Sequence, residues 1–172
     1  MKIEEAMPQL LHHVGVWKGE YVHFDGDNRE IDRHASMLIC KLLNEPGKQR
    51  LEQSNIYDWP DNSRETRHFV GILNNDKLVI QNENIDGWVA PLVLDETERT
   101  LMVLWTKTDD ASFRYYEMIT LSEDGQTKNR SWHWYRDGRL FQRTLINEKL
   151  ISRDWQAYDD PSYHHYSPRA PR

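Results

Sequence analysis

Residues 10–21 read Leu-Leu-His-His-Val-Gly-Val-Trp-Lys-Gly-Glu-Tyr, and this stretch decides the fold that we expect. It predicts a turn of helix that runs into a strand opened by Gly15-x-Trp17, while Arg143 stands far downstream in the last strand that the sequence predicts. An early tryptophan and a late arginine are typical of the closure of a small antiparallel barrel, in which a guanidinium lies over an indole ring. We therefore expect Arg143 to cover Trp17 where the first and last strands meet. Barrels of this kind commonly hold one small ligand.

Short segments rich in β-branched and aromatic residues follow one another along the chain, separated by turn residues such as Asp137-Gly138. They predict ten strands, over residues 16–24, 31–43, 49–57, 66–73, 77–82, 87–94, 100–106, 113–121, 127–135 and 140–148. Only residues 4–13 predict a helix, which argues against βαβ units. The fold class is therefore all-β and antiparallel, in up-and-down order. Such a meander either closes into one barrel or splits into two facing sheets, and we favour a barrel of about eight to ten strands.

The chain has 172 residues, which fits one domain. We expect a single barrel domain over residues 1–153 and an aromatic tail over residues 154–172, which Pro161 and Pro168 interrupt. Aromatic side chains in a coil rarely stay bare, so the tail is expected to pack across the barrel or to form a homodimer contact. We prefer the homodimer, and a disordered end is the third alternative.

The charge and cysteine content exclude several classes of protein. The formal net charge is −6, and no basic patch is present, so nucleic acid and anionic membranes are not expected partners. Residues 1–5 are acidic without an apolar run, which predicts no signal peptide, no membrane span and a cytoplasmic protein. Cys40 is the one cysteine, so an internal disulfide is excluded. It stands in an apolar run that predicts a buried, inert thiol.

Several motifs together resemble the calycin superfamily, which comprises lipocalins, fatty-acid-binding proteins and their relatives. They are Gly15-x-Trp17 followed by Gly19, the meander, and Arg143 in the last strand. A closer resemblance, to a group of bacterial lipocalin-like proteins, is carried by Tyr116-Glu117-Met118-Ile119, Trp132-His133-Trp134 and Arg143-Thr144-Leu145-Ile146 with Glu148. The likeness covers residues 10–150. It implies the binding or conversion of a small molecule, without naming a substrate.

Alternation of side chains along each strand predicts which residues face a cavity. Trp17 and Tyr21 share one face of the first strand, and the same rule groups Phe141, Arg143 and Leu145 on the last. The expected ligand-binding wall consists of Tyr21, Asn55, Tyr57, Trp88, Trp105, Trp134 and Arg143. Glu117 is also expected inside, paired with Arg143, because an isolated buried charge is costly. The tryptophans of this wall either line a void or fill the core, and the sequence leaves both alternatives open.

Glu117 and His68 are the candidate catalytic residues, since a carboxylate or an imidazole in a dry pocket can act as a general base. The alternative for His68 is a solvent-facing or hydrogen-bonded side chain. No metal is expected, because the adjacent pairs His12-His13 and His164-His165 diverge on regular backbone. No cofactor is expected either, because phosphate loops, nucleophile elbows and Cys-x-x-Cys motifs are absent from the sequence.

Three functions from different classes follow. The first is the binding of one small amphipathic or hydrophobic molecule inside the barrel. The second is a cofactor-free isomerase, cyclase or lyase that acts on such a molecule in the same cavity. The third is an assembly role through the aromatic tail. We rank binding first, with catalysis close behind, because complementarity to a ligand and to a transition state draws on the same residue types.

Overall fold

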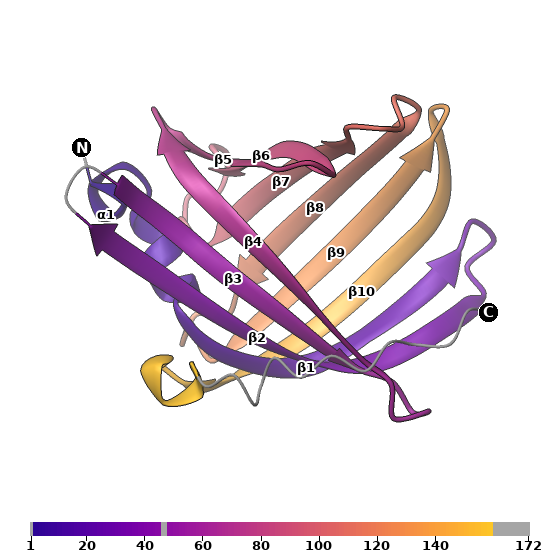
Figure 1. The fold of residues 1–172 in the computed structure, drawn as a ribbon, viewed down its shortest axis with the longest axis horizontal. Helices are drawn as coiled ribbons and strands as arrows, with labels where there is room; N and C mark the ends of the chain where they lie inside the picture. Colours follow the sequence, from indigo (N-terminus) through magenta and orange to yellow (C-terminus); the bar gives the residue numbers. More distant parts are fainter. Residues whose placement is uncertain (1, 46–47, 160–172) are drawn as a thin grey trace.

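The computed structural model of the chain describes residues 2–45 and 48–159. These residues form ten strands: β1 (Gly15–Asp25), β2 (Glu30–Glu45), β3 (Lys48–Asp58), β4 (Arg64–Asn74), β5 (Lys77–Gln81), β6 (Ile85–Pro91), β7 (Thr100–Lys107), β8 (Phe113–Leu121), β9 (Thr127–Arg136) and β10 (Arg139–Ser152). Each strand pairs antiparallel with its neighbours in the chain, and β1 pairs with β10, so the sheet closes into a barrel (Figure 1). The predicted all-β antiparallel barrel is confirmed.

Helical structure among the described residues is short. The predicted helix over residues 4–13 is a four-residue helix, α1 (Ile3–Ala6), followed by a 3₁₀ helix, η1 (Pro8–His13). Pro8 stands at the start of η1, where its missing N–H costs no hydrogen bond. A second 3₁₀ turn, η2 (Gln156–Tyr158), follows β10. No helix in the described ranges is both long and apolar enough to span a bilayer.

The tight turns form where the sequence supplies residues that tolerate a positive φ. The β9–β10 hairpin turns through Asp137 (φ 50°) and Gly138 (φ 73°), the pair of positive angles that a type I′ turn requires. Between β1 and β2, Asn28 alone takes a positive φ (67°). Because these turns match the twist of the flanking strands, they hold each hairpin in one register.

Closure of the barrel depends on a close approach between β1 and β10. Gly19 lies opposite Glu148, and a Cβ atom added at Gly19 would stand 2.1 Å from the carbonyl oxygen of Asn147. No side chain fits there. Glycine at this position therefore lets the first and last strands meet on the inner face between Trp17 and Tyr21.

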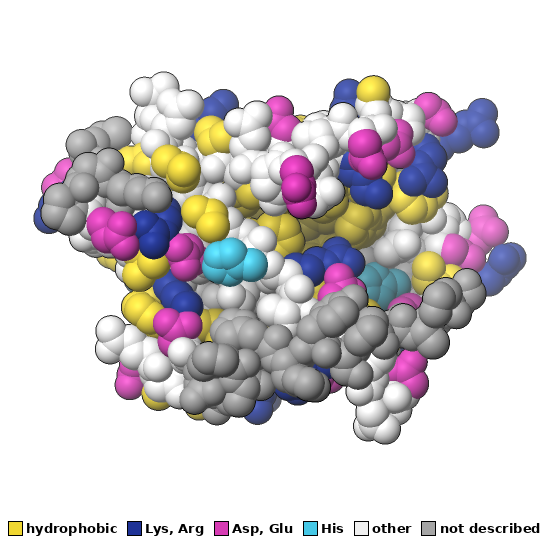
Figure 2. All heavy atoms as spheres, viewed as in Figure 1, with side chains coloured by type: hydrophobic (Ala, Val, Ile, Leu, Met, Phe, Trp, Pro, Cys, Tyr) yellow, Lys and Arg dark blue, Asp and Glu magenta, His cyan; other side chains and the backbone are white. Residues whose placement is uncertain are grey.

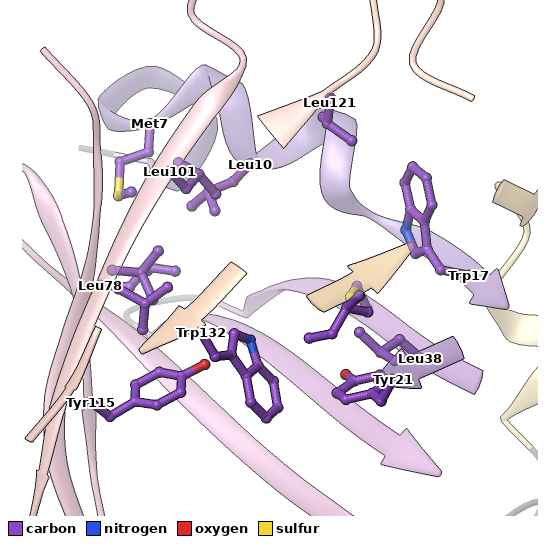
Figure 3. Packing of buried hydrophobic residues seen from close by; sticks show 14 of the residues in the cluster. Met7, Leu10, Trp17, Tyr21, Leu38, Leu78, Leu101, Tyr115, Leu121 and Trp132 are labelled. Atoms are coloured by element: carbon purple, nitrogen blue, oxygen red, sulfur yellow. The ribbon is translucent and has the colours of Figure 1, made fainter. Parts of the chain in front are cut away.

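One end of the barrel is covered by the N-terminal segment. Ile3, Met7 and Leu10 are at most 1 % exposed and pack into the same core as Trp17 and Leu101. Figure 3 shows Met7 and Leu10 beside Leu101, with the N-terminal ribbon passing behind them. The β1–β2 turn lies at the opposite end of β1 (Figure 1). We refer to these ends as the base, at Gly15, and the mouth, at Asp25.

Trp17 closes the base, but the arginine that covers it was not the predicted one. The ring centroid lies 4.3 Å from Lys128 Nζ and 5.6 Å from Arg153 Cζ, and the indole Nε1 donates to the His13 carbonyl oxygen at 2.9 Å. The predicted contact with Arg143 is wrong. β10 continues to Ser152 and runs antiparallel to β1, so Leu150 lies opposite Trp17, and Arg143 lies opposite Phe24 at the mouth.

The described part of the tail packs on its own barrel. Trp155 and Tyr158 lie against an outer cluster formed by Val16, Met37, Ile39 and Ile56. Lys41 Nζ stands 5.4 Å from the Trp155 ring centroid and forms an ion pair with Asp159. This is the first of the two packing alternatives that the sequence left open. Residues 160–172, including His164-His165, lie outside the described residues, and the homodimer stays a prediction.

Candidate functional site

The interior of the barrel contains a cavity of about 100 Å³ between the base and the mouth. Its wall is mostly apolar. Alternation along β7 turns Leu101, Val103 and Trp105 inward, and neighbouring strands add Leu78 and Trp134. For comparison, a water molecule needs about 10–15 Å³ of such space. The cavity therefore has room for several waters or for a small ring, and Trp105 and Trp134 of the expected wall line this void.

A second space, of about 380 Å³, adjoins the cavity at the mouth and is called the outer chamber here. Tyr57, Arg67, Trp132 and Trp134 line both spaces, so the cavity and the outer chamber share a wall. The guanidinium of Arg67 lies 5.8 Å from the Tyr57 ring centroid, and its Nε donates to Glu65 at 2.5 Å. Figure 2 shows that this face of the molecule is hollowed, with hydrophobic side chains gathered in the hollow and charged side chains beside it.

A network of buried charges crosses the interior below the cavity. Arg130 Nε donates to Glu117 at 2.5 Å, and its Nη1 lies 3.4 Å from Glu148. Lys128 Nζ lies 3.2 Å from the other oxygen of Glu148. All four side chains are at most 4 % exposed, and two positive charges face two negative ones. Since each charge has a partner, the network avoids the several kcal/mol that an isolated buried ion costs.

Two tyrosines complete this network. The hydroxyl of Tyr115 donates to Glu117 at 2.5 Å, and Arg130 Nη1 donates to the Tyr21 hydroxyl at 2.9 Å. Burial raises the pKa of both hydroxyls well above the usual tyrosine value, and the Glu117 carboxylate raises that of Tyr115 further. Burial alone would lower the pKa of Arg130, but its carboxylate partners and Tyr21 raise it well above the usual value. Both tyrosines are therefore neutral and Arg130 is charged.

A row of polar side chains follows the inner face of β3. Gln53 Nε2 donates to Asn55 at 2.8 Å, and Asn55 Nδ2 donates to the Tyr57 hydroxyl at 2.9 Å. Cys40 Sγ lies 3.4 Å from the Gln53 side-chain oxygen, and burial raises the pKa of this thiol. The row gives the cavity one polar wall whose groups bond to each other.

Two histidines meet at the mouth. His34 Nδ1 lies 3.1 Å from the Ala35 carbonyl oxygen and must donate to it, which leaves His34 Nε2 as an acceptor. His23 Nε2, at 3.1 Å, is then the donor, and His23 Nδ1 accepts from Thr144 at 2.9 Å. Both rings stack among aromatic side chains, with Tyr21 and Trp59 at 4.8 and 4.6 Å from His34. Both imidazoles form part of the wall of the outer chamber.

Most of the expected wall residues do lie inside. The structure brings together Asn55, Tyr57, Trp105, Glu117 and Trp134 around the cavity, and Tyr21 borders the outer chamber. Each comes from a strand on which the predicted alternation holds. Their contact with a ligand stays a prediction.

Three expected site residues lie elsewhere. Trp88 is on the outer face of β6, under Lys77 Nζ at 5.8 Å, because Gly87 and Val89 take the inward positions. His68 is half-exposed on the outer face of β4, where its Nδ1 lies 3.1 Å from Ser54 Oγ, because Arg67 and Phe69 point inward.

Arg143 is the third, and its inward assignment is wrong. Its guanidinium bonds to the Asn28 side chain at the mouth. A register shift between Leu140 and Gln142 changes the alternation along β10, so Thr144 and Ile146 point inward in its place. Glu117 pairs with Arg130 and not with Arg143.

Sequence reasoning missed His13, which lines the cavity from the end of η1 and is 5 % exposed. Burial and the charges of Lys128 and Arg130 lower its pKa well below 6.5, so the imidazole is neutral. The adjacent His12 is exposed, so the two rings diverge as expected for neighbours. In residues 2–45 and 48–159, His, Cys, Asp and Glu form no group of three that could hold a metal ion.

Comparison with known proteins identifies the fold but no family. No family model matches the chain, and no curated protein matches it. Among solved structures, the S-type phycobiliprotein lyase CPES from Guillardia theta superposes with a TM-score of 0.61 at 15 % identity, covering 87 % of this chain and 93 % of its own. The protein Rv2717c from M. tuberculosis gives a TM-score of 0.53 at 12 % identity, covering 84 % and 96 %.

A third similar structure is a protein of unknown function from the DUF3598 family of Nostoc punctiforme. Its TM-score is 0.59 at 19 % identity, and the match covers 81 % of this chain and 48 % of that one. The chain thus spans about half the length of the Nostoc protein. At these identities the similarity shows the fold alone, a closed antiparallel β-barrel, and no family.

Proposed function

We propose that this protein binds one small amphipathic molecule in the barrel, with an apolar body in the cavity and a further part in the outer chamber. The observation that carries the proposal is the mostly apolar cavity, which shares a wall with the outer chamber at the mouth. Folding normally fills a core at close to crystal density, so an apolar void beside hydrogen-bonded polar groups is typical of a ligand site. The predicted resemblance to lipocalin-like proteins supports the same function.

The cavity wall supports binding over catalysis. Both oxygens of Glu117 are occupied, one by Arg130 and one by Tyr115, so the carboxylate is held as a partner of the network. His68, the other candidate base, faces away from the cavity. The two expected catalytic residues therefore do not converge on one reacting atom, as acid–base catalysis requires. The phycobiliprotein lyase shares the fold, but at 15 % identity its reaction is not carried over to this chain.

Native mass spectrometry of the protein purified from its own cell tests the proposal directly. We expect a retained molecule to appear as an added mass that denaturation removes. The identity of that molecule would then define the ligand class.

A dye experiment tests the location of binding. Val103 lines the cavity and is 6 % exposed, whereas Leu104, the next residue of β7, points outward. We expect the uncharged dye N-phenyl-1-naphthylamine to gain fluorescence with the wild type and with Leu104→Phe, and to lose most of that gain with Val103→Phe, because the larger ring fills the void. Equal dye binding by all three folded proteins would place the dye outside the cavity and contradict the proposal.

A further inference from the structure

Two buried polar atoms on residues that line the cavity have no hydrogen-bond partner among the described residues. They are Nε2 of His13 and Nε1 of Trp132, whose side chains are 5 % and 8 % exposed. Buried polar groups in proteins nearly always have a partner, so each exception calls for an explanation. The indole N–H can only donate. It therefore needs an acceptor that the described part of the chain does not supply.

The two atoms stand out because most of the groups around them are hydrogen-bonded, and Glu148 Oε2, which has no hydrogen bond, is ion-paired with Lys128 at 3.2 Å. Arg130, which lies 5.3 Å from the Trp132 ring centroid, bonds to Glu117 and Tyr21. Tyr115 lies beside Trp132 (Figure 3), at a centroid distance of 5.3 Å, and its hydroxyl donates to Glu117 at 2.5 Å. The nearby Trp134 Nε1 donates to Thr144 Oγ1 at 3.2 Å. A ligand in the cavity thus meets two open positions in an otherwise closed network.

The charge balance of the interior limits what can fill them. Glu117 and Glu148 neutralise Arg130 and Lys128, and Arg67, which also lines the cavity, is paired with Glu65, so an ionised ligand group would find no unpaired counter-charge there. Burying a charge in that way is far more costly than burying a neutral polar group. The buried part of the ligand is therefore uncharged.

The imidazole of His13 further limits which chemical group of the ligand can bind there. A neutral imidazole carries one N–H and one bare nitrogen, so its Nε2 either donates or accepts, depending on the tautomer. A hydroxyl can do both, and it satisfies this atom in either tautomer. A hydroxyl also accepts from the indole N–H, which an aliphatic or purely aromatic group cannot do.

We propose that the cavity takes an uncharged, hydroxyl-bearing group of about the size of one ring, bound through Trp132 Nε1 and His13 Nε2. The inference rests on the proposed function and names the chemical class that the same site prefers. The rest of the ligand extends past Arg67 into the outer chamber.

Three probes of one ring each test the inference: phenol, toluene and benzoate. Phenol and toluene have nearly the same shape, but only phenol carries a hydroxyl, which stays protonated at pH 7 as tyrosine does. Benzoate carries a negatively charged carboxylate on the same ring and tests the effect of charge. Because a neutral hydrogen bond contributes about 0.5–1.5 kcal/mol, we expect phenol to bind about 2- to 13-fold more tightly than toluene. Benzoate is expected to bind more weakly than either.

Nuclear magnetic resonance of the indole N–H groups provides a readout at the atom itself. The chain has seven tryptophans, and the signal that disappears in Trp132→Phe belongs to Trp132. Phenol should shift this signal, and toluene should move it much less. In Trp132→Phe and in His13→Phe, phenol affinity should fall towards that of toluene, while Trp88→Phe, on the outer face, should keep the wild-type preference.

The outcomes separate the inference from the proposed function. If phenol and toluene bind equally to the wild type, or if phenol leaves the Trp132 signal in place, the hydroxyl assignment is wrong although the cavity binds ligands. If benzoate binds most tightly and shifts the Trp132 signal, the uncharged class is wrong. If none of the three probes binds to the folded protein, the proposed function fails together with the inference.

Discussion

Trp17 and Trp132 are both buried indoles in one barrel, but of the two only the Trp17 N–H has a hydrogen-bond partner among the described residues. Trp17, at the base, has its N–H bonded to the His13 carbonyl and its ring covered by Lys128 and Arg153. Trp132 has its ring packed on Tyr21 and Tyr115, but its N–H faces the cavity without a partner. Burial therefore does not tell a structural tryptophan from a ligand-facing one. The two tryptophans are distinguished by whether the indole N–H has a hydrogen-bond partner in the protein.

The largest effect is expected where the structural tryptophan is removed. Trp17→Ala deletes a fully buried ring and should lower the free energy of unfolding by about 3–5 kcal/mol, measured by urea denaturation. Trp88→Ala is the matched control, since this half-buried ring lies on the outer face, and it should cost about 1 kcal/mol. A Trp17→Ala cost as small as that of the control would show that Trp17 does not hold the base.

His13 contacts both tryptophan sites: its carbonyl oxygen accepts the hydrogen bond from Trp17, and its side chain lines the same cavity as Trp132. Its folded-state pKa is lowered by burial and nearby cations, so below about pH 6.5 the unfolded chain binds a proton that the folded protein does not. Stability should then fall by about 1.4 kcal/mol per pH unit through this group, from pH 6.5 down to the folded-state pKa. Above pH 6.5 the contribution is complete.

Unfolding of His13→Phe between pH 7 and pH 5 measures that contribution. The variant should lose less stability than the wild type as the pH falls, whereas His12→Phe, at the exposed neighbouring position, should follow the wild type. Parallel curves for the wild type and His13→Phe would mean that His13 takes up its proton in the folded state as easily as in the unfolded chain.

The smallest effect compares the same substitution at both tryptophans. Trp17→Phe loses the hydrogen bond to the His13 carbonyl and leaves that oxygen buried without a donor, whereas Trp132→Phe removes an N–H that had no partner. In the absence of ligand, Trp17→Phe should therefore be the more destabilising by about 1 kcal/mol in thermal or urea unfolding. Equal costs would indicate that ordered water already satisfies the Trp132 N–H.

The order of the strands was predictable because turn residues in the sequence mark where each strand begins and ends. Turn pairs such as Asp137-Gly138 mark the hairpins, and regular alternation, as along β7 and β8, fills the segments between. The prediction that a cation covers Trp17 where the barrel closes is confirmed, although the cation is a different one. The identity of that cation depended on the length of β10, which no residue signals, and Arg153 stands ten positions beyond the arginine that we expected.

The site was predictable wherever alternation alone decides the inward face. The predicted inward face was wrong at Trp88 and His68, because a large aromatic ring or an imidazole suits either face of a half-exposed strand. The neighbouring residues Gly87 and Arg67 take the inward positions instead. The predicted face was wrong at Arg143 because of a register shift. The position of His13 on the cavity wall could not be predicted from the sequence. Its orientation follows from the 3₁₀ helix that begins at Pro8, whereas the sequence predicts an ordinary helix there.

Arg153 has a consequence for how a ligand reaches the cavity. Its Nη1 donates to the carbonyl oxygens of His12 and Val14 at 2.7 and 2.9 Å, and its Nη2 donates to that of Gly125 at 3.1 Å. One side chain thus ties the N-terminal segment, the β8–β9 turn and the end of β10 together. Opening the base would break three charge-assisted hydrogen bonds at once. We therefore expect the proposed ligand to enter from the mouth, where Arg67 and Trp59 line the outer chamber.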